Sequence, residues 1–435
     1  MASTYLQRTN TSGTNTYTFS AWVKLCNPSK TANQWIFTSN DGGLMTRDNS
    51  SSSGAEFHFY NSDNNTNYYS GAKRRDASGW YHIVLSSNSG TGTLYVNGET
   101  DKTGIVVPNL STSSNAMQIG RLASSGNDYF NGLMSHVHFI DGTAYTASSF
   151  GSTDTTTGEW KINTSPSVTY GSQGFFILKD GNSLTDQSPN TNNFTLGGGT
   201  LTKTEDNPSN VFCVLNRLNS DQPTGSVNMQ YGNTGFEDGE NGSNYSYVSG
   251  TLGANSGKFY WETKVIDLAE IDQVGVVLAS SSFIGAANSN GLQATTYGGK
   301  GCQFSNGYKV GDGSGGAYMG GFSANDIMMI ALDLDNNKIT FGRNGQWADG
   351  SGNANQTYAN STPAYTNLTA GEFYFPAQAK RAGGGNYGTN WYNFGNGYFQ
   401  TTAVSSEGTN VSGNGIFEYD VPTGFTALST KGLNL

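Results

Sequence analysis

The residues that could carry out chemistry are few in this chain, and their spacing suits catalysis poorly. Hydrolysis of a glycosidic bond needs two carboxyl groups that flank the bond, one of them acting as an acid. The spacing Glu-x-Asp-x-x-Glu would supply such groups, and Glu270-Ile271-Asp272 approaches it without the last carboxylate. Glu237-Asp238-Gly239-Glu240 lies among glycine and asparagine in a predicted turn. We therefore predict no catalytic residues and expect that the protein is not an enzyme.

The histidines offer one arrangement that could hold a metal. His136 and His138 alternate along a predicted strand and should point to one face, as a two-ligand metal clip could. No cysteine or glutamate joins them at a metal-ligand spacing, so we favour a packed or hydrogen-bonded pair and predict no metal and no cofactor. Loop carboxylates leave calcium open without forming a dense ligand series: Asp41, Asp63, Asp128 and Asp141.

Aromatic side chains in loops are better candidates for a site. Proteins bind sugars on exposed aromatic rings, flanked by amide and carboxylate groups that hydrogen-bond the hydroxyls. The glycine-rich segment 383–392 has this composition, and a weaker candidate is the pair Tyr68-Tyr69. The alternative is that Trp391 and Tyr392 only pack the end of the last strand. The predicted carbohydrate-binding residues are Tyr387, Asn390, Trp391, Tyr392, Tyr68 and Tyr69.

Composition and charge argue against several classes of partner. The formal net charge is −10 at pH 7, which argues against a nucleic-acid partner, and the one basic cluster, Lys73-Arg74-Arg75, is short and is followed at once by Asp76. No apolar run is long enough to span a membrane, and the N-terminus lacks the pattern of a secretory signal. We expect no nucleic-acid partner, no membrane insertion and synthesis in a cytosol. The 3 cysteines are too far apart for a disulfide framework.

Short alternating strands and asparagine-glycine turns predict an all-β fold. The segment Tyr17–Val23 alternates with period two, as a half-buried strand should. The strand pair 80–85 and 93–96 runs into Asn97-Gly98, a dipeptide that tolerates the positive φ values of a type I′ turn. A similar hairpin in the second half runs into Asn344-Gly345.

These patterns recur on both sides of a looser stretch of sequence. We predict two antiparallel β-sandwich (jelly-roll) domains in tandem. The expected boundaries are residues 1–180 for the first sandwich, 181–225 for an irregular connector, and 226–435 for the second sandwich.

Motifs in the first half carry a resemblance to known proteins. The segments "YTFSAWVKL" (17–25), "GWYHIVL" (79–85) and "LYVNGE" (94–99) resemble laminin-G-like (concanavalin A-type) sandwich domains. The segments "FIDGTAYTASSFGSTDTTTGEW" (139–160) and "NPSNVFCVLNRLN" (207–219) are similar to a group of tailed-phage and environmental-virus proteins. The turn Gln187-Ser188-Pro189-Asn190 departs from that group, which more often has Ser-Gly-Asn-Gly there.

The second half resembles a different binding module. The segments "GKFYWETKV" (257–265) and "IMMIALDLDNNKITFGRNGQW" (327–347) resemble SPRY domains, which are two-sheet β-sandwiches. The closing "VPTGFTALSTKGLN" (421–434) is similar to the ends of phage structural proteins.

Together the resemblances imply a virion component assembled in the host bacterial cytoplasm. The leading hypothesis is a non-enzymatic protein displayed on a phage particle, as a fibre-like or decorating appendage that adheres to host-surface polysaccharide. The alternative is a purely structural protein that cements capsid or tail subunits. Expected partners are other virion proteins, host-surface glycans and further copies of this chain in a homo-oligomer.

Overall fold

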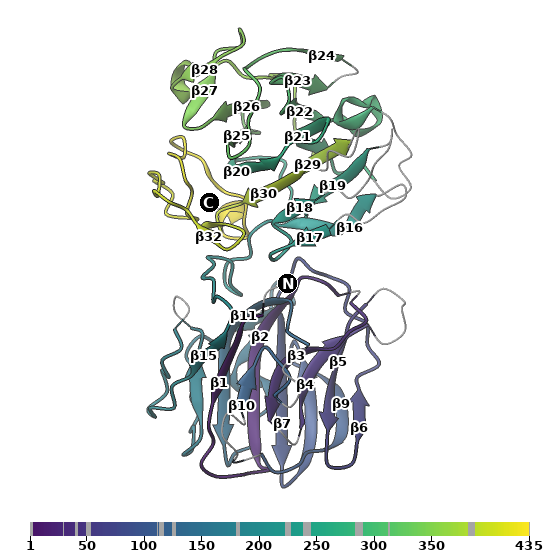
Figure 1. Cartoon of the computed structure of the whole chain (residues 1–435), viewed down its shortest axis with the longest axis vertical. Coiled ribbons are helices and arrows are strands. Elements are labelled where there is room, and N and C mark those ends of the chain that lie inside the picture. The colour runs from purple at the N-terminus through teal and green to yellow at the C-terminus, as the bar shows by residue number, and fades with distance from the viewer. Residues whose placement is uncertain are drawn as a thin grey trace. The chain divides into compact units, whose positions relative to one another are not determined.

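The structure is a computed structural model that describes residues 3–28, 30–39, 42–48, 54–110, 112, 117–123, 128–179, 183–221, 228–237, 245–282, 290–311, 314–381 and 388–434. The chain divides into two compact units (Figure 1). Unit 1 comprises Met1–Lys203 and Asn207–Ser209, and unit 2 comprises Thr204–Asp206 and Asn210–Leu435. Each unit is a β-sandwich whose sheets are antiparallel apart from one short parallel pair, which confirms the predicted all-β tandem fold.

Unit 1 is built from a seven-stranded and a six-stranded sheet. The seven-stranded sheet has the order β15 (Thr195–Gly198), β1 (Tyr5–Arg8), β10 (Met117–Ile119), β3 (Gln34–Ser39), β4 (Gly42–Arg47), β5 (Glu56–Asn61) and β6 (Thr66–Tyr69). The six-stranded sheet has the order β14 (Phe175–Ile177), β11 (Gly132–Asp141), β2 (Tyr17–Leu25), β7 (Tyr81–Asn88), β8 (Thr91–Val96) and β9 (Glu99–Val106).

The core of unit 1 follows from strand alternation. Phe57 and Phe59 on β5 point inward, and both are buried among the apolar side chains of the opposite sheet. The rings of Phe19 and Phe37 stack with centroids 4.5 Å apart and so join the two sheets. Because side chains alternate along a strand, His58 and Tyr60 point outward.

The predicted turn at Asn97-Gly98 is confirmed. It connects β8 to β9, and its φ angles are 50° and 85°. The matching turn at Asn344-Gly345 has φ angles of 50° and 83°. Positive φ at both central residues is what a type I′ turn requires.

Unit 2 is built from a seven-stranded and a nine-stranded sheet. The first has the order β16 (Leu215–Asp221), β19 (Ser246–Gly250), β29 (Tyr374–Arg381), β21 (Ile271–Leu278), β22 (Lys300–Gln303), β23 (Tyr308–Gly311) and β24 (Ser314–Ala317). The second has the order β17 (Asn228–Gln230), β18 (Gly235–Glu237), β30 (Thr389–Asn393), β20 (Lys258–Asp267), β25 (Ile327–Asp333), β26 (Lys338–Arg343), β27 (Gln346–Ala348) and β28 (Ala354–Gln356), with β33 (Thr426–Ala427) parallel to β20.

The expected irregular connector at 181–225 is wrong. Strand β15 pairs with β1 of unit 1, and β16 pairs with β19 of unit 2, so this stretch supplies an edge strand to each sandwich. The units divide near residues 203–210 instead. Short polar edge strands carry a weak sequence signal because one of their sides and much of their surface face solvent.

Several outer sheet faces are covered by other segments of the same unit. In unit 1, η1 (Ala147–Ser149), β12 (Gly151–Thr153) and β13 (Trp160–Ile162) lie over Val84 and Ile140 of the six-stranded sheet. In unit 2, η2 (Gly291–Gln293) and η3 (Thr295–Tyr297) pack on the seven-stranded sheet. The C-terminal segment covers the nine-stranded sheet and contains β31 (Tyr398–Phe399), β32 (Thr402–Ala403) and η5 (Gly432–Asn434); η4 (Tyr358–Asn360) packs beside it.

Gly98 offers a test of how the hairpin β12–β13, which carries Trp160, packs on the six-stranded sheet. A Cβ at Gly98 would lie 2.4 Å from the Trp160 ring, whereas a Cβ at Gly104 would meet nothing within 4 Å, although φ is also positive there. We expect Gly104→Ala to cost about 1 kcal/mol of unfolding free energy through φ alone. Gly98→Ala should cost roughly 1–3 kcal/mol more through overpacking. Urea unfolding measures both, and equal losses would contradict this account.

Candidate functional site

The predicted site at 383–392 is not an exposed loop where the structure describes it. Tyr387 lies outside the described residues. Residues Thr389–Asn393 form β30, which lies between β18 and β20 within the nine-stranded sheet. Asn390 and Tyr392 point inward and are 0% and 1% exposed, so the prediction that they bind sugar is wrong.

Asn390 and Tyr392 belong instead to a buried polar network between the two sheets. The Tyr392 hydroxyl donates to Gln378 Oε1 at 2.5 Å, and Gln378 Nε2 donates to Asp272 Oδ1 at 2.6 Å. Lys380 Nζ lies 3.4 Å from Asp272 Oδ2 and donates to Asn390 Oδ1 at 2.7 Å. Burial raises the pKa of Asp272, and the Lys380 ammonium opposes that shift. The network is structural because its charged groups are 0% exposed.

Trp391 points to the opposite face of β30 and is half-buried. It lies opposite Gly235 on β18 and Lys264 on β20. Its indole Nε1 is buried and has no hydrogen-bond partner among the described residues. Trp391 is therefore the one described residue of the 383–392 candidate that keeps some accessible ring surface.

Tyr68 and Tyr69 cannot form one platform, because consecutive strand residues point to opposite faces. Tyr68 packs against the core of unit 1. Tyr69 lies on the outer face, where its ring is 4.7 Å from that of His58 and 5.8 Å from the Arg47 guanidinium. Tyr69 thus keeps the position that a surface site needs, and Tyr68 does not.

Tyr69 is part of a group of polar and aromatic side chains that the strand register brings together. The pairings Trp35↔Met45, Met45↔His58 and His58↔Tyr69 place one residue from each of β3 to β6 in a row on the outer face. In the next row Tyr60 pairs with Asn67. We call Arg47, Tyr60, Asn65, Asn67 and Tyr69 the outer-face cluster.

The outer-face cluster offers the groups that recognise hydroxyl-rich ligands. Tyr60 donates its hydroxyl hydrogen to Asn65 Oδ1 at 3.1 Å, and Arg47 Nη1 donates to Asn33 Oδ1 at 3.2 Å. Asn65 and Asn67 are exposed, and Tyr60 and Tyr69 are half-buried. Aromatic faces, amides and a guanidinium therefore lie on one surface. The sequence analysis missed Arg47, His58 and Tyr60, although the alternation in "EFHFYN" (56–61) contained the signal for His58 and Tyr60.

His58 and Trp35 lie beneath this cluster. They are 0% and 2% exposed, and neither the His58 ring nitrogens nor Trp35 Nε1 has a well-directed hydrogen bond among the described residues. Burial lowers the pKa of His58 to about 4; the backbone of Glu56 opposes this shift and the charge of Arg47 adds to it. His58 is therefore neutral near pH 7.

A serine–histidine pair in unit 1 has the distance of a nucleophile and its base but the wrong tautomer. Ser20 Oγ lies 2.9 Å from His82 Nε2, and Trp160 Nε1 donates to His82 Nδ1 at 3.0 Å. An indole N–H can only donate, so Nδ1 accepts and Nε2 carries the ring proton. Nε2 then donates to Ser20 and cannot take its proton. Burial lowers the pKa of His82 to about 3, and the pair is 0–1% exposed.

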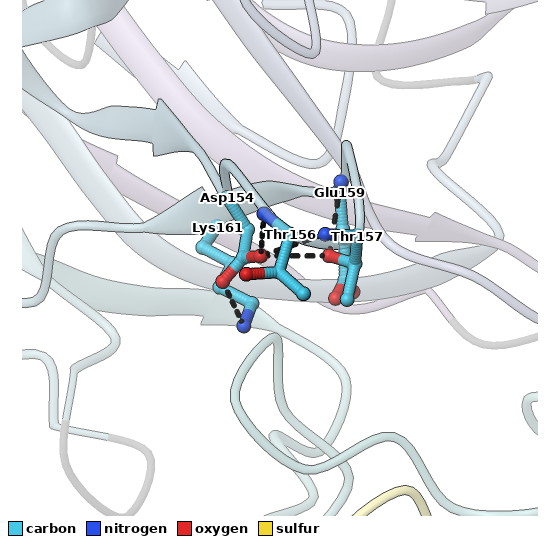
Figure 2. Close-up of polar contacts among 5 residues, drawn as sticks. All are labelled: Asp154, Thr156, Thr157, Glu159 and Lys161. Carbon is cyan, nitrogen blue, oxygen red and sulfur yellow. Dashed lines mark hydrogen bonds and ion pairs between the residues drawn. The ribbon is translucent and has the colours of Figure 1, made fainter.

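The hairpin that carries Trp160 is held by its own polar loop. Figure 2 shows Asp154 accepting hydrogen bonds from the backbone N–H groups of Thr156 and Thr157, both at 2.9 Å, with the Lys161 ammonium 2.7 Å from Oδ2. These contacts, the one to Lys161 foremost, hold the pKa of Asp154 well below its usual range. The charged Asp154 thus orders a loop that contributes little to any core.

His136 and His138 are each bonded to a different hydroxyl. A β-bulge between Ser135 and His138 gives His136 a φ of 48°. Nδ1 of His136 lies 2.8 Å from Ser135 Oγ, and Nδ1 of His138 lies 2.9 Å from Tyr170 Oη. Within the part of the chain that the structure describes, no three histidine, cysteine or carboxylate side chains lie close enough together to hold a metal.

The carboxylates of the Glu270-Ile271-Asp272 segment are separated by the fold. Glu270 lies on the surface, 2.9 Å from Arg381, while Asp272 faces the interior. In the second acidic segment, Glu237-Asp238-Gly239-Glu240, the structure describes Glu237 only, and residues 238–240 lie outside the described residues. Among the helices that the structure describes, none is long and apolar enough to cross a membrane.

Comparisons with known proteins agree with the resemblance of the first half. Residues 2–149 match the Concanavalin A-like lectin/glucanases superfamily. A SPRY domain of human HERC1 is similar to part of the chain at 15% identity and a TM-score of 0.32, covering 41% of this chain and 96% of that one. Another human SPRY domain shows 14% identity and a TM-score of 0.25, with 37% and 90% covered. Among curated proteins, none matches this chain.

The depressed pKa of His58 predicts acid-sensitive stability. The unfolded chain binds a proton at His58 below about pH 6.5, and the folded chain does so only below about 4, so stability is lost as pH falls through that window. We expect protonation linked to His58 to lower the free energy of unfolding by about 2 kcal/mol between pH 7 and pH 5. His58→Leu should lose correspondingly less over the same interval in urea unfolding. The same loss in both proteins would contradict the assignment.

The buried pair Lys380–Asp272 makes a second prediction. Lys380→Met leaves the Asp272 carboxylate buried without its cation. It should lower the free energy of unfolding by about 3–5 kcal/mol. Lys380→Met combined with Asp272→Leu should restore most of that stability. Lys258→Met removes a lysine that is 31% exposed and leaves its partner Asp333 with Lys338 at 3.7 Å, so it should cost about 1 kcal/mol or less of unfolding free energy and serves as the control. A single Lys380→Met as stable as the parent would contradict this account.

Proposed function

We propose that this protein is a non-catalytic, carbohydrate-binding component of a phage particle, an appendage that adheres to host-surface polysaccharide. The observation that supports this most directly is the outer-face cluster of unit 1. It combines half-buried tyrosines with exposed amides, which are the groups that bind sugar rings and hydroxyls. The superfamily that matches residues 2–149 includes lectins by its description.

The arrangement of the catalytic-type side chains supports a non-enzymatic role. Ser20 faces a histidine nitrogen that is already protonated, and Asp272 is buried against Lys380. The virion context rests on the motif resemblances alone, and so do the proposed contacts with other virion proteins and the homo-oligomer.

Weak single sites suit such an appendage. A tyrosine face contributes about 0.5–1.5 kcal/mol to a contact, which is too little for tight binding by one copy. Many copies on one particle would engage a cell surface together, and effective concentration then raises the avidity.

Binding of polysaccharide by the chain displayed on beads tests the proposal. Removing one tyrosine face, by Tyr69→Ala or Tyr60→Ala, should weaken binding by roughly 2- to 10-fold per copy. Tyr308→Ala removes a tyrosine that is 44% exposed in unit 2 and should leave binding unchanged.

The outcomes separate the function from its site. No binding to any bacterial surface polysaccharide at high valency contradicts adhesion. Binding that is unaffected by both Tyr69→Ala and Tyr60→Ala contradicts the outer-face cluster as the site. Particles that lose stability on deletion of the protein, yet adsorb to cells normally, would favour the alternative cement role.

A further inference from the structure

The carboxylate of Glu262 lies between β20 and the C-terminal segment of unit 2, and it is 0% exposed. Its Oε2 accepts hydrogen bonds from the backbone N–H of Glu418 at 2.9 Å and from Asn393 Nδ2 at 3.3 Å. Its Oε1 accepts from the backbone N–H of Tyr419 and from the Tyr260 hydroxyl, both at 2.9 Å. Two of these bonds tie the C-terminal segment directly to the sheet.

The same segment covers an apolar face of the nine-stranded sheet. Phe417, Val421 and Phe425 belong to one buried cluster with Tyr260, Met329, Ala331 and Trp347 of the sheet. The segment is also bonded to itself, through Gly408 N–H to the Phe417 carbonyl and Val421 N–H to the Thr409 carbonyl, each at 2.9 Å. Its polar attachment to the sheet includes Glu262 and also Asn393, whose Nδ2 donates to the Ile416 carbonyl at 2.9 Å.

No cation balances Glu262. Among the described residues, no lysine or arginine lies within ion-pair distance of it, and Lys264, two residues along β20, contacts the Phe399 ring instead. The other titratable groups around Glu262 and its tyrosine partners are phenols or carboxylates: Tyr260, Tyr419, Glu418, Asp420 and Asp326. Burial raises the pKa of Glu262 to about 7, although the four donors oppose the shift.

We propose that residues 404–421 form a pH-sensitive latch on unit 2. The segment is held most firmly while Glu262 is protonated, and ionisation of that buried carboxyl weakens the latch and favours exposure of the apolar face beneath it. The inference concerns unit 2 and does not depend on carbohydrate binding by unit 1.

The sign follows from the two states of Glu262. In the released segment the carboxyl is in water with a pKa near 4.5, and in the closed segment the pKa is about 7. The closed state therefore holds the proton more tightly. Closure is strongest below about pH 4.5, weakens up to about pH 7 and is constant above it, with a change of at most roughly 300-fold in the opening equilibrium.

Hydrogen–deuterium exchange of the full chain between pH 5 and pH 8 tests the latch at the Glu418 and Tyr419 amides. After correction for intrinsic exchange, the opening equilibrium of the parent protein should increase by about 70-fold from pH 5 to pH 8. Glu262→Gln should make opening independent of pH. Glu407→Gln removes an exposed carboxylate from the same segment and should leave the profile unchanged.

A second variant keeps the test decisive if Glu262→Gln opens the segment at every pH. Tyr260→Phe removes one donor to the ionised carboxylate, so it should extend the rise in opening above pH 7 without making opening uniform. Opening of the parent protein that is flat from pH 5 to pH 8 would overturn the proposal. So would a Glu262→Gln profile equal to that of the parent, or a Glu407→Gln profile equal to that of Glu262→Gln.

Discussion

Several sheets of this protein carry apolar side chains on both faces. The structure depends on covering the outer of these two faces. Strand β25 (Ile327–Asp333) is a nearly continuous apolar run, and β7 (Tyr81–Asn88) contains the apolar run Ile83-Val84-Leu85, so in both one face packs in the sandwich core and the other needs a second layer. Unit 1 places the hairpin β12–β13 over Val84 and Ile140. Unit 2 places its C-terminal segment over Met329 and Ala331. Each cover supplies large aromatic side chains, because a thin layer can bury a sheet only with bulky groups.

Polar contacts decide where these covers attach. Trp160 reaches the sheet through His82, and the C-terminal segment reaches it through Glu262. Both sheet residues are 0% exposed, and neither has an opposite charge beside it among the described residues. A buried histidine without a counter-charge prefers the neutral form, and so does a buried carboxyl. Protonation of His82 would therefore disfavour the attachment in unit 1, while ionisation of Glu262 would disfavour the attachment in unit 2.

The outer-face cluster contrasts with these covered faces. At Tyr60 on β5 and at Asn67 and Tyr69 on β6 the outward side chains are tyrosine and asparagine rather than valine or methionine, and they keep access to solvent. The arrangement is a surface of rings and amides above a buried layer of Trp35 and His58. Its position on the sheet, rather than on a long loop, gives it a rigid base.

The sequence by itself determined the strands, their turns and the tandem of sandwiches, because alternation and asparagine-glycine pairs are local signals. It could not assign β15 and β16 to their sheets, since short polar edge strands lack such a signal. Alternation separates Tyr68 from Tyr69 and Trp391 from Tyr392, but it does not say which face of a strand is inside. Only the tertiary structure decided that Tyr392 packs in the core while Tyr69 stays at the surface, because burial depends on which layer lies over each face.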